Sequence, residues 1–152
     1  MIDKQARAKL SESLRHLVSG QITNDQFEKI APRKSNDRAI WAIRHRAWFL
    51  YDDLKEYKLK GKYALTPKAK GVITRWLLFL KSNFEYEWPT HPGELWWGLI
   101  LHLLSLSLIS RIFWNRTWIR SGNSKIWPFI REKDLQKARR MPKLLSGAGR
   151  KA

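Results

Sequence analysis

Apolar residues recur at helical spacing from the start of the chain. Leu10, Leu14 and Leu17 lie three or four positions apart, which places them on one face of a helix. Gly20 follows the last of them, and glycine commonly ends a helix because it adopts a left-handed backbone at little steric cost. This pattern predicts a first helix over residues 3–19.

A second helix start follows within a few residues. Thr23 and Gln26 have the spacing of a capping box, in which each side chain accepts a hydrogen bond from the backbone N–H of the other residue. Ile22 and Phe27 flank this box with the spacing of a hydrophobic staple. We therefore expect a short helix over residues 24–30.

The next segment carries a wider apolar stripe. Its members are Ile40, Ile43, Ala47, Leu50 and Leu54, and Trp41, Trp48 and Tyr51 lie beside them. A helix that is apolar around so much of its circumference is typical of the centre of a fold. The pattern predicts a long central helix over residues 37–57.

A fourth helix start is indicated by Thr66 and Pro67, which have the pattern of an N-cap and a first helical residue. The apolar residues that follow extend this helix over residues 67–82. With these four helices, residues 1–90 are expected to form one helical lobe. The fold class that this implies is mainly α, a small helical bundle.

Residues 91–145 are expected to add an apolar helix and a basic C-terminal region. Residues 95–110 form a run without a charged side chain. A membrane span needs about 20 such residues, whereas shorter runs are more often buried helices. The arginines that follow the run would also suit the cytoplasmic side of a membrane. A core helix, a membrane-associated helix and a partner interface all remain open for this run.

The pattern changes again after residue 113. Within residues 114–120, Trp and Arg alternate at every second position. Residues 121–124 have a turn composition, and residues 125–130 form a short aromatic segment. These features allow one short β-hairpin near the C-terminus. A last helix is expected over residues 131–140, and residues 146–152, which are small and basic, are expected to form a flexible tail.

The net charge of the chain provides evidence about its binding partner. Lys and Arg number 30 against 13 Asp and Glu, which gives a formal net charge of +17. From Arg111 onward there are 12 basic and 2 acidic residues. So large a charge disfavours a compact chain through self-repulsion unless a partner neutralises it. We therefore expect a polyanionic partner: nucleic acid, an acidic protein or an anionic membrane surface.

Two groups of side chains in the basic region have the chemistry to contact such a partner. If residues 114–120 form a strand, two Trp and two Arg share one face and would stack on bases and bind phosphates; in a helix the Trp pair would favour core packing. The last helix would present Lys133, Lys137 and Arg140 on one face. The candidate polyanion-binding residues are Trp114, Arg116, Trp118, Arg120, Lys125, Arg131, Lys133, Lys137, Arg139 and Arg140.

Catalytic and metal-binding patterns are not evident in the sequence. The chain has no Cys, which excludes disulfides and thiolate ligands, and its four His are scattered. Asp52, Asp53 and Glu56 cluster, but neighbouring Lys and Arg are their expected partners. We expect a non-enzymatic protein with no cofactor, no metal and no small-molecule substrate, located in the cytoplasm or, alternatively, at the inner face of the membrane.

Residues 14–28 combine a Leu-rich helix, Gly20, an Ile-Thr pair and an acidic helix with Phe27 and Glu28. This arrangement resembles the short bacterial helical motif called SHOCT. The resemblance implies a helical hairpin that assists association, although the motif usually ends a chain and here lies near its start. Residues 48–54, 85–89 and 127–129 resemble uncharacterised bacterial proteins, from which no function follows.

These observations favour one function over two others. The first is a basic accessory or regulatory protein, bacterial or phage-encoded, that binds nucleic acid or a nucleoprotein complex. The alternative is an inhibitor or immunity-type factor that docks an acidic protein, because the nine Trp and many Arg are the residue types of binding hot spots. The second alternative is a membrane-associated protein that uses residues 95–110.

Overall fold

The computed structural model describes residues 1–52, 54–88 and 124–141, and these residues form helices, turns and loops without a strand. The α-helices are α1 (Lys4–Val18), α2 (Asn24–Ile30), α3 (Arg38–Ala47), α4 (Pro67–Lys81) and α7 (Glu132–Arg139). Short 3₁₀ turns are η1 (Trp48–Leu50), η2 (Gly61–Tyr63) and η4 (Ser124–Ile126). The prediction of a mainly α fold, a small helical bundle, is confirmed.

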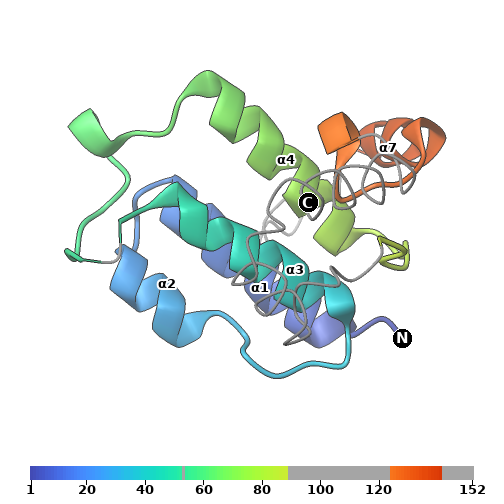
Figure 1. Cartoon of the computed structure of the whole chain (residues 1–152), viewed down its shortest axis with the longest axis horizontal. Helices are drawn as coiled ribbons and strands as arrows, with labels where there is room; N and C mark the ends of the chain where they lie inside the picture. The colour runs from blue at the N-terminus through green and yellow to red at the C-terminus, as the bar shows by residue number, and fades with distance from the viewer. Residues whose placement is uncertain (53, 89–123, 142–152) are drawn as a thin grey trace, which may run out of the picture.

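The N-terminal helices pack around α1. α1 contacts α2, α3 and α4, and α7 contacts α4. Figure 1 shows α1 and α3 side by side, with α2 at one end of the molecule and α7 at the other, beside the C-terminal part of α4. The described residues 124–141 therefore share one hydrophobic core with the N-terminal helices.

The helix starts follow the local signals in the sequence. The side chain of Thr23 accepts from Gln26 N–H at 3.2 Å, and the Gln26 side chain accepts from Thr23 N–H at 3.0 Å, so the capping box is complete. Thr66 caps α4 by accepting from Ala69 N–H at 3.2 Å. As a result, α1, α2 and α4 match the helices predicted over residues 3–19, 24–30 and 67–82.

Gly20 ends α1 in the expected way. Its φ is +66°, and its N–H donates to the Leu17 carbonyl at 2.9 Å. A Cβ at this position would lie 2.4 Å from the side chain of Lys60. Both the backbone conformation and the close packing therefore require glycine here.

The prediction of one helix over residues 37–57 is wrong beyond Ala47, where α3 ends. Side chains take the place of helical hydrogen-bond partners in the segment that follows. The Asn24 amide donates to the carbonyls of Asp52 and Lys55 at 3.0 and 2.8 Å, and its oxygen accepts from Tyr57 N–H at 2.9 Å. Asn24 thus holds Asp52, Lys55 and Tyr57 in a loop against α2.

The interpretation of Trp41 and Trp48 as part of the core stripe is also wrong. Ile40 and Ile43 are buried against the other helices, and the two indoles lie on a different side of α3. Trp41 is 53% exposed and Trp48 is 48% exposed. The helix turns 100° per residue, so the face that carries Trp41 together with Arg44 and His45 is turned to solvent when Ile40 and Ile43 face the core.

Aromatic rings join α4 to the segment before α7. Phe79 meets Phe129 edge to face with centroids 5.1 Å apart, and Trp76 meets Trp127 in the same way at 5.7 Å. The Trp127 indole N–H donates to the Tyr86 hydroxyl at 3.1 Å. This aromatic cluster of Trp76, Phe79, Tyr86, Trp127 and Phe129 positions α7 on α4.

The second arm of the expected β-hairpin, residues 125–130, is not a strand. Residues 126–129 are all buried, whereas a half-buried strand alternates between buried and exposed positions. Pro128 also has no N–H to donate to a neighbouring strand. The first arm, the apolar run 95–110 and the tail 146–152 lie outside the described residues. No helix among the described residues is long and apolar enough to cross a membrane.

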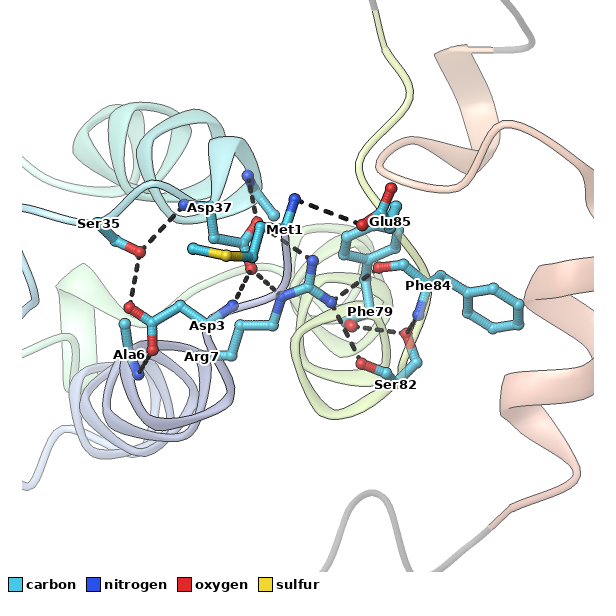
Figure 2. Close-up of polar contacts among 11 residues, drawn as sticks. Met1, Asp3, Ala6, Arg7, Ser35, Asp37, Phe79, Ser82, Phe84 and Glu85 are labelled. Atoms are coloured by element: carbon cyan, nitrogen blue, oxygen red, sulfur yellow. Dashed lines mark hydrogen bonds and ion pairs between the residues drawn. The ribbon is translucent and has the colours of Figure 1, made fainter.

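A buried ion pair connects three helices (Figure 2). Arg7 of α1 and Asp37, the N-cap of α3, are 1% and 3% exposed. The Arg7 Nε and Nη2 donate to the Asp37 carboxylate, the latter at 3.2 Å. Arg7 Nη1 donates to the carbonyls of Ser82 and Phe84, which follow α4, at 3.2 and 2.9 Å. The ion pair is therefore buried, and each nitrogen of the Arg7 guanidinium donates at least one hydrogen bond.

We predict that Asp37→Ala lowers the free energy of unfolding by about 3–5 kcal/mol, because it leaves the Arg7 guanidinium buried without its counter-ion. Urea denaturation followed by circular dichroism measures this change. Glu85→Ala is the matched control, since it removes an exposed carboxylate that lies 3.4 Å from the N-terminal amine in the same corner. The control should change stability by about 0.5 kcal/mol or less. Equal effects of the two variants would contradict the prediction.

Candidate polyanion-binding surface

α7 is held by one face and presents the other to solvent. Leu135 and Ala138 are buried against the core. Glu132 lies in the first turn and Lys137 in the last turn, which places each charge near the helix end of opposite partial charge. The sequence therefore specifies both the orientation of α7 and which of its side chains face outward.

Three cations share the outer face of α7. Lys133, Lys137 and Arg140 are exposed and line one shallow depression of about 550 Å³, together with Gln136 and Met141. Their spacing of four and three residues brings them to the same side of the helix, as the sequence indicates. In the part of the chain that the structure describes, none of the three is in an ion pair. We call Lys133, Lys137 and Arg140 the α7 cations.

Arg139 lies on a different side of α7, toward α4. Burial lowers the pKa of the Arg75 guanidinium on α4, and the positive charge of Arg139 lowers this pKa further. The Nε of Arg75 is buried without a hydrogen-bond partner among the described residues. The positive charge of Arg139 thus acts on the Arg75 guanidinium, and no described carboxylate is paired to Arg75.

Arg131 and Lys125 do not line the depression of the α7 cations. Arg131 lies 3.7 Å from the carboxylate of Glu87, so an acid already offsets part of its charge. Lys125 is exposed on η4, which precedes the buried residues 126–129. Trp114, Arg116, Trp118 and Arg120 lie outside the described residues.

Acidic side chains gather at a separate place on the same part of the molecule. Glu85, Glu87 and Asp134 line a small hollow together with Phe79 and Phe129. Glu132, the other acid of α7, is exposed and accepts from Gln136 Nε2 at 2.9 Å, and Gln136 lines the same depression as the α7 cations. One carboxylate therefore stays beside the three cations, and the local charge remains positive.

Arg75 is the cation that sequence reasoning missed. It lies within the apolar pattern of α4, far along the chain from α7, and no local spacing relates it to Arg139. Its signal in the sequence is a single Arg inside an otherwise apolar run, between Ile73 and Trp76. The apolar part of such an Arg side chain can pack beside buried residues while its charged end reaches the surface.

The described residues contain no group of three or more His, Asp or Glu side chains that could hold a metal ion. No protein-family profile, curated protein or solved structure matches this chain. Any function is therefore argued from the residues themselves and their arrangement.

We predict that Arg75→Met raises the free energy of unfolding by about 1 kcal/mol. The change removes a buried, unpaired N–H donor and the repulsion from Arg139, and it keeps an unbranched chain that packs in the same place. Thermal and urea denaturation measure the effect. Lys70→Met, at an exposed position of the same helix, is the matched control and should change stability by about 0.5 kcal/mol or less. A less stable Arg75→Met protein would mean that the guanidinium stabilises the fold.

Proposed function

We propose that this protein is a non-enzymatic accessory or regulatory protein that binds nucleic acid, alone or within a nucleoprotein complex, through the α7 cations. The observation that supports this most is the outer face of α7 itself: three exposed cations line one depression, and none of them is in an ion pair among the described residues. Phosphate groups spaced along a nucleic acid backbone match such a row of point charges. The cytoplasm is the compartment that we propose for this activity.

Arg139, on the side of α7 toward α4, and Arg75 of α4 add two further guanidinium groups to this part of the molecule. Charge-assisted hydrogen bonds to guanidinium groups are a common way of binding phosphate. An acidic protein could also neutralise these positive charges, so the test must distinguish binding of an acidic protein from binding of nucleic acid.

The test is a salt titration of binding to a short DNA duplex and its RNA counterpart, measured by fluorescence anisotropy. Each phosphate neutralised on a duplex contributes about 0.9 to the slope of log affinity against log salt. We predict that Lys133→Ala/Lys137→Ala/Arg140→Ala reduces this slope by about 2–3 and weakens binding at low salt. Lys4→Ala/Lys9→Ala/Lys58→Ala is the matched control, because it removes the same charge at exposed positions on other elements.

Equal slopes for the two triple variants would refute the α7 cations as the contact surface. Absence of binding to duplex and single-stranded nucleic acid at low salt would refute the function as a whole. Two further results would assign the surface to another partner and would also refute the proposal. One is tight binding to anionic lipid vesicles without binding to nucleic acid, and the other is a stoichiometric acidic protein that stays bound after nuclease treatment.

A further inference from the structure

An aromatic pocket is lined by residues of α2, α3, η1 and the loop after α2. Figure 1 shows α2 at the end of the molecule away from α7. Its volume of about 530 Å³ is within the range of sites that bind small molecules. Trp41, His45 and Trp48 supply aromatic rings from α3 and the turn that follows it, and Lys29 and Arg33 supply cations from α2 and the loop after it. We call this the Trp41 pocket.

The rings in the Trp41 pocket are already arranged for stacking. The Trp41 indole and the His45 imidazole are nearly parallel, with an interplanar angle of 6° and centroids 5.0 Å apart. Trp48 meets His45 edge to face at 6.3 Å. About half of each indole is open to solvent, so another flat ring can be added without displacing a core residue. A nucleic acid base is such a ring, and stacking accepts any base because each has a π-face.

The charges around the pocket favour a ligand that carries negative charge beside the flat ring. Glu28 also lines the pocket, but its carboxylate accepts from Arg44 Nη2 at 2.7 Å and from the Tyr51 hydroxyl. Asp25 is the other acid in the lining and lies in the first turn of α2, where the helix N-terminus stabilises its charge. Lys29 and Arg33 are exposed and in no described ion pair, and Arg33 Nη2 donates to the Glu28 carbonyl at 3.4 Å, so both positive charges remain available to a phosphate.

We propose that the Trp41 pocket binds an unpaired nucleotide of a single-stranded nucleic acid, with the base stacked on the Trp41–His45 pair and the phosphate beside Lys29 and Arg33. This inference rests on the proposed nucleic-acid function and adds a second site to it. Bases inside a duplex are stacked on each other and do not reach such a pocket. The site therefore discriminates single strands from duplexes, whereas the α7 cations bind the backbone of either.

The first arm of the test is Trp41→Ala, with affinity for a single-stranded homopyrimidine oligonucleotide measured by anisotropy at constant salt. Loss of one base–aromatic stack weakens binding about 5- to 100-fold. Affinity for the duplex is expected to stay unchanged, and Trp41→Tyr is expected to restore most of the single-strand affinity. The matched control is Leu54→Ala, since Leu54 is 85% exposed and does not line the pocket.

The second arm is Lys29→Ala/Arg33→Ala, which tests the phosphate contact without changing a ring. Each lost contact reduces the salt slope on single strands by about 0.7, so a total decrease of about 1.4 is expected. Both side chains are exposed, so this variant keeps the test valid if Trp41→Ala does not fold.

The outcomes separate this inference from the proposed function. If duplex and single-strand binding depend on the α7 cations but not on Trp41, Lys29 or Arg33, the Trp41 pocket is not a nucleotide site and the proposed function stands. Equal weakening of duplex and single-strand binding by Trp41→Ala would also overturn the inference. Absence of all nucleic-acid binding would overturn both, and an acidic aromatic peptide that occupies the pocket instead would replace the nucleotide as its ligand.

Discussion

The guanidinium of Arg7 is the group on which the arrangement of the helices depends. Its fixed fork of N–H donors reaches the Asp37 carboxylate on one side and the carbonyls of Ser82 and Phe84 on the other, while its face lies over the ring of Phe79 at 5.1 Å. A Lys ammonium carries the same charge without the planar fork, so it could not make these contacts together. One side chain thus fixes α1, the start of α3 and the end of α4 relative to one another (Figure 2).

The position of the α7 cations follows from that contact through a chain of buried groups. Once the carbonyls of Ser82 and Phe84 are fixed, residues 85–88 continue along α4 and bring Tyr86 to Trp127. The Trp88 indole N–H donates to the Phe129 carbonyl at 3.3 Å, a further bond between this loop and the segment before α7. α7 begins three residues after Phe129, so its orientation is set by residues near the N-terminus.

The structural features that the sequence predicts depend on interactions between residues close together in the chain. Those that it does not predict depend on contacts between distant segments. Capping signals such as that of Thr23 act within four residues, so a single sequence displays them completely. Ile43 and Trp41 are both apolar residues of α3, and which of them is buried depends on the packing of α3 against α1 and α4, which are distant in sequence. The outer face of α7 was predictable from spacing alone, whereas its neighbour Arg75 and the Trp41 pocket required the packing of separate helices.

Both proposed surfaces reduce the stability of the free protein. A half-exposed indole forgoes part of the free energy that its burial would contribute, and cations gathered on one helix face repel one another. Such costs are commonly retained where a partner offsets them. The residues responsible for these costs lie on the outer faces of α3 and α7. The inner faces of the same helices pack into the core through Ile43 and Leu135. The fold therefore tolerates an aromatic surface and a cationic surface at once, and together these suit a ligand that has both flat rings and phosphates.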